Sequence, residues 1–568
     1  MTRNSIWLAI LSASLSMQAG ASAAPIDLSP VPALASPVKL PRDWHHGAFM
    51  EVFVRAYQDS DGDGVGDLPG LISRLDYLKK LGVKGLWLMP IQTSADRDHG
   101  YHTVDFRAVA PEYGTLADFD RLLKEAGRRG IGVIIDYAVN HSSAEHPMFV
   151  EARANAQSPW RSWYVWSEQE PKGWDIWGKN PWYWNHGEPW NFKGAMKDLP
   201  KAPDDARDFY FGTFGPHAPD FNLRNPEVVE YHLSSLRFWL NRGLAGYRLD
   251  AVPHLIENSA KDWNDQPESR ALTKQIADLI RSYPNRYVVC EATAKPIDYG
   301  DPAVCGGAFA FGYVQHFVEA TRGKPESVAK LAEYFRRPQE RRRRRSSPEG
   351  SGPSNGGTAL PTMATFVSNH DIFAGKRLWD QVEGDVARYK LAAAGYLLQP
   401  GTPFIYFGEE VGQAGAAGLP NDQPLRAPMS WQADNDQPSG FTTGAPFRPF
   451  APNLATYNAA AQQRNPSSIF SFYRAMLRLR NLRSSIARGS FEQSFADGMV
   501  LGFQRVLGRE RTLVLINYGS AAADVQVPGL VAKARLVQVY PATRTTTQRA
   551  ANITLPPQSV RVYSVNAR

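Results

Sequence analysis

Three short carboxylate-bearing stretches occur in a fixed order along this chain of 568 residues, each at the end of an apolar run. They contain Asp250, Glu291 and Asp371. Two carboxyl groups about 5–5.5 Å apart can cleave an acetal with retention, because one attacks the anomeric carbon while the other protonates the leaving oxygen. The sequence supplies such groups, so it predicts this chemistry provided that the fold brings the three stretches together.

The neighbouring residues suggest a different task for each carboxyl group. Arg248 precedes Asp250 by two residues, so in a strand both side chains share a face, and the guanidinium would keep the carboxylate ionised as a nucleophile requires. Glu291 follows buried residues, which would raise its pKa so that it can hold a proton as an acid/base. Asp371, preceded by His370, would face the positive charge that develops on the sugar.

Alternating strand-like and helical patterns would position these groups. Strands are predicted at residues 49–54, 85–89, 132–136, 244–250, 287–291, 309–313, 364–369 and 403–407, and helical spacing between them is clearest at 68–81, 116–129, 228–241 and 386–398. Eight strands that alternate with helices predict an α/β fold, a (β/α)8 TIM barrel at residues 46–137 and 223–484. The carboxylates would then meet on the carboxyl-terminal rim of the barrel, where such folds carry their active sites.

Two further domains are expected outside the barrel. The connection after the third strand is far too long for a loop, so residues 138–222 are predicted to form an inserted domain B. Eight of the fifteen tryptophans lie there, and we expect most of them to form its core and others to be able to stack on sugars: Trp160, Trp163, Trp166, Trp174, Trp177, Trp182, Trp184 and Trp190. Period-two alternation after residue 484 predicts a C-terminal antiparallel β-sandwich at 485–568.

The N-terminus resembles a secretory signal. Arg3 is followed by an apolar stretch at residues 6–15 and by small residues up to Ala23, after which we expect cleavage. An uncleaved membrane anchor would need about 20 apolar residues, more than this stretch contains. We therefore expect residues 1–23 to be a signal peptide and 24–45 a linker. The protein would be exported to the periplasm or the medium, with no membrane partner after cleavage, and we expect a monomer.

Charge and cysteine content exclude little. The net charge of +7 owes much to arginines at 336–345, beside a Ser/Gly/Pro-rich stretch, and we interpret this run as a solvated loop. No aromatic residues are interleaved with it as in nucleic-acid sites, so no nucleic-acid partner is expected, although an anionic surface partner stays open. Cys290 and Cys305 are the two cysteines; a bridge in an export compartment and a packed thiol are both compatible with the sequence.

With these motifs the chain resembles the α-amylase family of glycoside hydrolases, which have a (β/α)8 barrel. The matching stretches are 136–141 (DYAVNH), 219–222 (PDFN), 246–254 (GYRLDAVPH), Glu291 and 368–371 (SNHD), in the family's order, and the resemblance covers about residues 46–568. It implies that Asp250 is the nucleophile, Glu291 the general acid/base and Asp371 the transition-state stabiliser. It also implies that the residues surrounding the sugar at the cleavage point include Tyr101, His141, Arg248, His254 and His370.

An acidic turn after the first strand is a candidate calcium site. Asp59, Asp61, Asp63 and Asp67 alternate with glycines, which places hard oxygen ligands on a tight turn. It is not an EF-hand, because a glycine occupies the twelfth position, and a polar turn without an ion stays open. The loop resembles one in the family that holds calcium with four side chains and a carbonyl, here of Val65. A second family calcium site would use Asn140 and the His254 carbonyl, with a carboxylate that the sequence does not assign.

The choice of substrate depends on residues around the triad. Asp98 and Arg426 resemble a pair that closes the pocket around a terminal glucose in exo-acting α-glucosidases and trehalose synthases. His102 and Phe106 look more amylase-like, and Pro253 replaces a lysine that many amylases use at a leaving-group subsite. We predict an α-amylase that hydrolyses α-1,4-glucosidic bonds in starch and maltooligosaccharides with retention; the alternative is an exo-acting α-glucosidase or a maltose/trehalose-interconverting trehalose synthase. Non-catalytic family members lack the carboxylate set and carry a membrane anchor.

Overall fold

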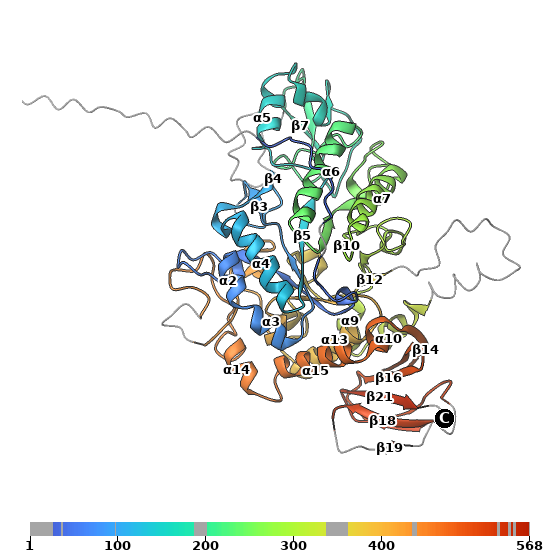
Figure 1. The fold of residues 1–568 in the computed structure, drawn as a ribbon. Coiled ribbons are helices and arrows are strands. Elements are labelled where there is room, and N and C mark those ends of the chain that lie inside the picture. The colour runs from blue at the N-terminus through green and yellow to red at the C-terminus, as the bar shows by residue number, and fades with distance from the viewer. Residues whose placement is uncertain are drawn as a thin grey trace, which may run out of the picture.

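The computed structural model describes residues 26–35, 38–96, 98–186, 202–336, 362–433, 440–530, 534–542, 547–548 and 552–566. The predicted signal peptide at 1–23, Trp190 and the arginine run at 341–345 lie outside these ranges. Figure 1 shows a central barrel with a small domain above it and two β-sheets beside its lower end. Among the described residues no helix is both long enough and apolar enough to cross a membrane.

Eight parallel strands form the barrel. Their order is β12 (Met363–Ala364), β11 (Ala308–Phe309), β10 (Tyr287–Cys290), β9 (Gly246–Asp250), β5 (Gly132–Ala138), β2 (Gly85–Leu88), β1 (Phe49–Val52) and β13 (Phe404–Tyr406). The two outermost strands also meet, because Phe404 N–H donates to the Thr365 carbonyl over 2.8 Å and Thr365 pairs with Pro403 in parallel. The predicted TIM barrel is therefore confirmed.

The register of these strands brings the candidate residues to one rim. Asp136 of β5 is paired with Arg248 of β9, and Cys290 of β10 with Leu249. The Glu291 N–H continues this ladder by donating to the Leu249 carbonyl over 2.9 Å. Residues far apart in sequence thus lie side by side at the carboxyl ends of β5, β9 and β10.

Several barrel strands are shorter than predicted, and the difference is largest for β11 and β12. Regular pairing in β11 stops at Phe309, because the chain turns at Ala310, whose carbonyl accepts from Tyr313 N–H over 3.1 Å, and Gly312 adopts φ +74°. β12 stops at Ala364, after which one bridge at Thr365 replaces continuous pairing. The apolar run that predicted a strand at 364–369 therefore contains only the last residue of β12, followed by a buried, irregular segment that leads to His370.

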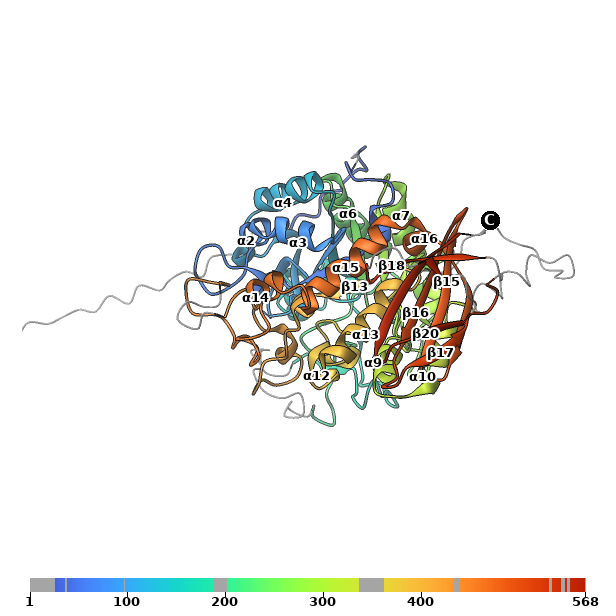
Figure 2. The same cartoon turned by 90° about the horizontal axis from the view of Figure 1, so that it is seen from below.

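Helices surround the barrel, as the view from below in Figure 2 shows. The predicted helix at 68–81 is two helices, α2 (Leu68–Ser73) and α3 (Leu75–Leu81), which break at Arg74. Its guanidinium lies over the Trp431 ring at 4.1 Å and donates to the Gly440 carbonyl, so contacts outside the helix hold this residue. The other barrel helices of seven or more residues are α4 (Leu116–Arg128), α6 (Pro226–Asn241), α7 (Pro267–Ser282), α9 (Gln315–Thr321), α10 (Pro325–Glu333), α13 (Val386–Leu398) and α15 (Ile469–Leu482).

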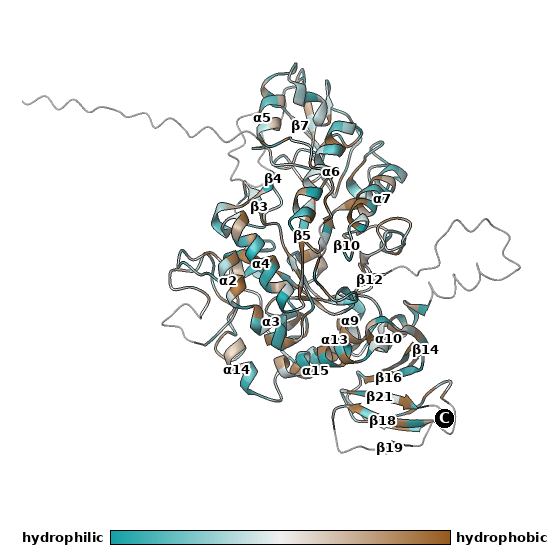
Figure 3. Cartoon of the chain, viewed as in Figure 1, coloured by the Kyte–Doolittle hydropathy of each residue, from teal (hydrophilic) through white to brown (hydrophobic). Residues whose placement is uncertain are grey.

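Short helices complete the connections: α1 (Val54–Tyr57), α5 (Pro147–Ala154), α8 (Pro296–Tyr299), α12 (Leu378–Gln381), α14 (Ala459–Arg464) and α16 (Ser484–Arg488). The hydropathy pattern explains the layers, because β5 is buried along its length and is mostly apolar apart from Asp136, whereas α4 alternates polar and apolar residues (Figure 3). The helices therefore bury one stripe against the barrel and leave the other in solvent.

The inserted segment forms a small domain built on an antiparallel sheet of β6 (Trp166–Ser167), β8 (Phe209–Phe211) and β7 (Trp182–Trp184). Aromatic packing holds it together, since the Phe211 ring lies between those of Trp174 and Trp182 at 5.1 and 5.0 Å. Trp163 is 5% exposed, whereas Trp177 is 58% exposed. Most of the described tryptophans here are at least partly buried, and Trp177 is the one that faces solvent. Below this domain, β3 (Gln92–Ser94) and β4 (Thr103–Val109) form a hairpin.

The C-terminal region contains two antiparallel sheets. One comprises β14 (Ser490–Asp497), β15 (Val500–Leu507), β16 (Glu510–Asn517), β21 (Ser559–Asn566), β18 (Arg535–Tyr540) and β19 (Thr547–Gln548), and the other β17 (Ala523–Gln526) and β20 (Asn552–Leu555). Alternate residues of the larger sheet face opposite ways: Leu513 and Leu515 pack on the small sheet, whereas Val514 and Ile516 join the barrel core. The sheet thus contributes to two cores at once.

Candidate active site

Arg248 lies at the centre of the rim and joins three carboxyl groups. One guanidinium nitrogen, Nη1, contacts Asp136 Oδ1 at 2.8 Å and Asp250 Oδ1 at 2.5 Å, and Nη2 contacts Glu291 Oε2 at 2.5 Å. The side chain of Arg248 is 1% exposed. A buried cation with three carboxylate partners requires that the fold hold them all, so β5, β9 and β10 position this cluster jointly.

Asp250 and Glu291 form a coupled pair. Burial raises the pKa of Glu291 to about 8; Arg248 opposes this shift and the charge of Asp250 adds to it. Burial also raises the pKa of Asp250 against the effect of Arg248, so the arginine does not alone decide its ionisation as the sequence suggested. Because the two carboxyl groups contact each other, the pair holds one proton near neutral pH, and Glu291 is the group that takes it.

Asp371 is the third carboxyl group at this point, and His370 lies against it. His370 Nε2 is 3.1 Å from Asp371 Oδ2, and His370 Nδ1 is 2.7 Å from Glu51 Oε1 on β1. Burial alone would lower the pKa of His370, but the charges of Asp371 and Glu51 raise it to about 10. Burial likewise opposes ionisation of Asp371, but His370 and Arg426 hold its pKa well below the ordinary value. The site therefore contains an ionised carboxylate beside a protonated imidazole.

Tyr101 is an aromatic residue that contacts both Asp136 and His370. The Tyr101 hydroxyl donates to Asp136 Oδ2 over 2.8 Å and lies 2.9 Å from His370 Nε2, and the two rings stack with centroids 5.4 Å apart. Trp87 of β2 donates from its indole nitrogen to the same Asp136 oxygen over 3.1 Å. Asp136 thus connects Tyr101, Trp87 and Arg248, and all four side chains are fixed by hydrogen bonds from different strands or loops.

His141 and His254 lie on the side toward domain B. His141 Nε2 is 3.2 Å from the Tyr101 carbonyl, and burial lowers its pKa to about 3. Burial lowers the pKa of His254 to about 4, so both rings are neutral near pH 7. The His141 ring contacts Phe214 at 5.2 Å, and His254 stacks on Trp263 at 5.5 Å. An aromatic wall therefore extends from His141 toward solvent.

Asp98 and Arg426 lie together next to Asp371. Arg426 Nη1 is 3.3 Å from Asp98 Oδ2, and its Nη2 is 3.4 Å from Asp371 Oδ1. A third residue, Arg448, donates to Asp98 Oδ1 over 3.0 Å. Asp98 is therefore held by two guanidinium groups, one of which also contacts the candidate stabiliser Asp371.

A comparison with known families decides what kind of site this is. The model of the alpha-amylase catalytic domain matches residues 51–489, most of the chain. The chain belongs to the α-amylase family. It is 33% identical over 520 residues to a trehalose synthase/amylase, TreS, of Mycolicibacterium smegmatis, covering 83% of this chain and 82% of that protein. As a family member it is therefore an enzyme that acts on α-glucosidic bonds.

Two other proteins are also similar to this α-amylase family chain. A probable alpha-glucosidase of Rhizobium meliloti is 29% identical over 543 residues, which cover 86% of this chain and 91% of that protein. Among solved structures, the trehalose-6-phosphate hydrolase TreA of Bacillus licheniformis superposes with a TM-score of 0.72 at 24% identity, covering 92% of this chain and all of that one. At that identity the structural match supports the fold alone.

The acidic turn of this family member brings together three of the predicted calcium ligands. Carboxylate oxygens of Asp59, Asp61 and Asp67 lie within 4.8 Å of one another, and Asp59 and Asp67 are buried. Burial and the neighbouring charge of Asp61 raise the pKa of Asp67. The carboxylate of Asp63 is not in this group; its Oδ1 accepts the Val65 N–H over 2.8 Å. Clustered oxygens that repel one another fit a hard cation such as calcium.

The predicted second metal residue, Asn140, faces an acidic pair that the sequence did not assign. The Asn140 side chain interacts with Asp220, whose other contacts are Thr213 N–H at 2.9 Å and Thr213 Oγ1 at 2.7 Å. Thr213 Oγ1 is also 3.5 Å from Glu257. Burial raises the pKa of Asp220 to about 7, and burial together with the charge of Asp220 raises the pKa of Glu257. Asp220 is thus a carboxylate of the inserted domain that interacts with Asn140.

Sequence reasoning missed Glu51, Trp87 and Arg448. Glu51 lies inside the first apolar strand, where a charged residue is a recognisable signal because ionisable groups are rarely buried without a partner. Trp87 and Arg448 carried no such local signal. The structure also decides between the open alternatives for the cysteines: Cys290 and Cys305 form a disulfide beside Glu291.

Proposed function

We propose that Asp250, Glu291 and Asp371 catalyse a double displacement with retention. The protonated Glu291 donates its proton to the glycosidic oxygen while Asp250 attacks the anomeric carbon and forms a glycosyl ester. Glu291, now a carboxylate, then takes a proton from water or from a sugar hydroxyl while the oxygen of that acceptor attacks the anomeric carbon and displaces Asp250 as a carboxylate. This proposal is supported by the contacts of Asp250 and Glu291 with the same Arg248 guanidinium, which hold the two carboxyl groups close together. Inverting enzymes instead keep their two carboxyl groups about 6.5–9.5 Å apart to leave room for a water.

The surrounding residues are proposed to bind the sugar at the cleavage point. Tyr101 offers an aromatic face, and Asp371 with protonated His370 offers a charged pair for hydroxyl groups and for the developing oxocarbenium charge. His141, as a neutral ring, can donate or accept one hydrogen bond. His254 would lie on the leaving-group side, next to Trp177 and Trp263.

For the substrate, we propose the terminal α-1,4-linked glucosyl unit of maltose and short maltooligosaccharides. The observation that carries this proposal is the pair of guanidinium contacts on Asp98, from Arg426 and Arg448. Two cations on one carboxylate beside Tyr101 would close the cleft on the side from which a longer chain would continue. The comparisons favour this alternative over internal cleavage of starch, since their names include an alpha-glucosidase and a trehalose synthase/amylase.

Conversion of maltose to trehalose is the second candidate. It is favoured by 33% identity over 520 residues to the trehalose synthase/amylase of M. smegmatis. In that reaction the released glucose turns within the closed site, and its anomeric hydroxyl attacks the glycosyl ester in place of water. Hydrolysis and isomerisation then share the first step and differ in the acceptor.

A structural calcium ion is proposed at the acidic turn. Asp59, Asp61 and Asp67 would supply carboxylate oxygens, together with the Val65 carbonyl, and we leave Asp63 out of the proposed ligands because its carboxylate lies outside the cluster. Such an ion would fix the loop that follows β1, the strand that carries Glu51. At Asn140 we propose no ion.

Export is proposed from the N-terminal pattern, and the disulfide between Cys290 and Cys305 supports it, because such bonds persist mainly in oxidising compartments.

A product analysis tests the proposed activity. The purified protein is incubated with maltose, maltoheptaose, end-blocked maltoheptaose and soluble starch. We expect glucose from maltose and from free ends, with or without trehalose, and no cleavage of the blocked substrate. Internal cuts in the blocked substrate would instead establish an α-amylase, and no turnover at all would overturn the proposal.

A further inference from the structure

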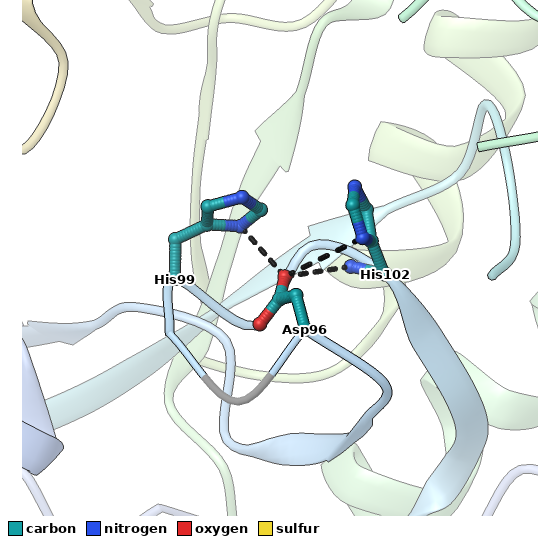
Figure 4. Close-up of side chains that lie close together, drawn as sticks. All are labelled: Asp96, His99 and His102. Carbon is teal, nitrogen blue, oxygen red and sulfur yellow. Dashed lines mark hydrogen bonds and ion pairs between the residues drawn. The ribbon is translucent and has the colours of Figure 1, made fainter. Parts of the chain in front are cut away.

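A second cluster of ligand-type side chains lies outside the catalytic group, in the hairpin loop between β3 and β4. Asp96, His99 and His102 are spaced by three residues each, and one ligand atom of each lies within 4.8 Å of the others. Figure 4 shows the two imidazole rings above the Asp96 carboxylate, with both Nδ1 atoms directed at the same oxygen. Asp98 and Tyr101 lie within this same loop.

The two oxygens of Asp96 have different contacts. Oδ1 accepts the backbone N–H groups of Asp98 at 2.9 Å and Gly100 at 3.0 Å, and so shapes the loop. Oδ2 faces His99 Nδ1 at 2.9 Å and His102 Nδ1 at 3.9 Å, besides accepting the His102 N–H at 3.3 Å. Both oxygens therefore accept backbone N–H groups of the loop, and Oδ2 is in addition directed at two imidazole nitrogens.

Hydrogen bonds alone do not account for this arrangement. His99 Nδ1 lies between a donor, the Tyr101 N–H at 3.1 Å, and an acceptor, Asp96 Oδ2. A ring nitrogen has either a proton or a lone pair to offer, so one of the two contacts is unmet in any single state. The 3.9 Å between His102 Nδ1 and Asp96 Oδ2 is too long for a hydrogen bond. His102 Nδ1 therefore faces this oxygen without a hydrogen bond to it, whichever proton His99 carries.

A single metal cation would bind all three groups through lone pairs, and the His99 Nδ1 lone pair would then be directed at the ion in place of the Tyr101 N–H. Bonds of about 2.0–2.2 Å around a tetrahedral zinc ion place ligand atoms about 3.4 Å apart, between the observed 2.9 and 3.9 Å. Two imidazoles and one carboxylate form a donor set for zinc and related transition metals, whereas calcium prefers oxygen ligands alone. The side chains of His99 and His102 are 27% and 24% exposed, so an ion can reach them from solvent.

We propose that Asp96 Oδ2, His99 Nδ1 and His102 Nδ1 bind a divalent transition-metal ion of the zinc class at the edge of the active site. The fourth position would hold water or a further side chain. His217 of domain B is the adjacent ring, with its centroid 5.9 Å from that of His102. The ion would fix the loop that carries Asp98 and Tyr101, so its binding would be felt at the sugar site through these two residues.

The test uses the untagged full chain, treated with a chelator and then exchanged into buffer with excess calcium so that the acidic turn is saturated. Zinc is titrated against a colorimetric chelator of known affinity, and cobalt is added separately for its visible absorption bands. We expect one zinc per chain, an unfolding temperature that rises with zinc by mass action, and cobalt bands typical of mixed nitrogen and oxygen ligands. The double variant His99→Gln/His102→Gln should bind zinc at least tenfold more weakly and lose the cobalt bands.

A matched control is His186→Gln, which removes a 62% exposed histidine of domain B and should leave zinc binding unchanged. Circular dichroism of the double variant checks that it is folded. His217→Gln adds a second arm and should weaken zinc binding less than the double variant does. Zinc affinity equal in the wild type and the double variant, or no stoichiometric zinc binding at all, would overturn the proposal.

Discussion

Glu51 and His370 form a buried ion pair beneath the candidate active site, with Glu51 Oε1 2.7 Å from His370 Nδ1 and neither side chain more than 2% exposed. The opposite nitrogen of the ring faces Asp371. The imidazole is thus held between two carboxylates, and their charges outweigh burial to raise its pKa to about 10. Glu51, on the first barrel strand, therefore helps to keep His370 protonated, although His370 follows the seventh barrel strand, β12.

Glu51→Gln should make the site more sensitive to alkali. The substitution removes one of the two charges that raise the pKa of His370, so the ring would lose its proton at lower pH and Asp371 would lose its cationic partner. We expect kcat/KM to fall roughly 10–100-fold near pH 8, the value of one charge-assisted hydrogen bond of about 1.5–3 kcal/mol. The loss should shrink as the pH is lowered. Kinetics between pH 5 and 9 measure this dependence.

Glu230→Gln is the control for that experiment, because Glu230 is an exposed partner of Arg237 far from the rim. Its pH profile should match the wild type. A Glu51→Gln enzyme with a uniformly reduced rate at every pH would show that Glu51 acts through packing and not through the charge of His370.

The alkaline limb of activity should reflect Glu291. Its pKa is raised to about 8, so the proton required by the leaving oxygen is present below that pH and is lost as the pH rises through it. Glu291→Gln should remove this limb and slow maltose far more than an aryl α-glucoside whose leaving group needs no proton. Asp250→Asn should instead slow both substrates more than roughly a thousandfold, because the covalent step is lost. Equal losses on both substrates in Glu291→Gln would contradict its role as the acid.

Much of the barrel could be predicted from sequence because its strands are buried on both faces and appear as continuous apolar runs. The lengths of β11 and β12 could not. The run at 364–369 is apolar because it is buried, not because it is paired, and periodicity does not separate these two states. Likewise, Arg74 has good helix propensity, and it interrupts the helix through distant contacts with Trp431 and Gly440.

The candidate site was predictable where its residues follow strand ends in sequence, as Asp250 and Glu291 do. Contact partners that lie on other elements, far away in the sequence, were not predictable. Arg448 lies 350 residues from Asp98, and no local pattern connects them. The state of Asp250 was predicted only in part, because Arg248 two residues earlier suggested an ionised carboxylate, whereas burial and Asp136 raise its pKa. The sum of these opposing effects requires the three-dimensional arrangement.

Arg448→Met should loosen the wall of the cleft that we propose Asp98, Arg426 and Arg448 to form. It removes one of two guanidinium partners, while Arg426 remains, so the carboxylate should stay in place but move more freely. Asp98 is 22% exposed, which limits the contribution of the pair to about 1 kcal/mol. We expect KM for maltose to rise about fivefold with little change in kcat, and the relative rate on maltoheptaose to increase. Arg464→Met, on the exposed end of α14, is the control. An unchanged ratio between the two substrates would contradict a role of this wall in chain-length selection.

Removal of calcium should destabilise the fold if the acidic turn binds it. A ligand at a hundred times its Kd stabilises the native state by about 2.7 kcal/mol, so a calcium-selective chelator should lower the unfolding temperature of the wild type and added calcium should restore it. Asp61→Asn should abolish this response, because it removes one charged oxygen of the cluster. The turn itself should be kept, since Asp61 is exposed and the amide oxygen of asparagine can still accept the Asp63 N–H, which Asp61 Oδ1 accepts over 3.2 Å. Asp63→Asn is the matched control, since its carboxylate lies outside the cluster, and it should respond like the wild type. If Asp61→Asn and the wild type lose the same number of degrees in chelator, the stabilising ion is bound elsewhere.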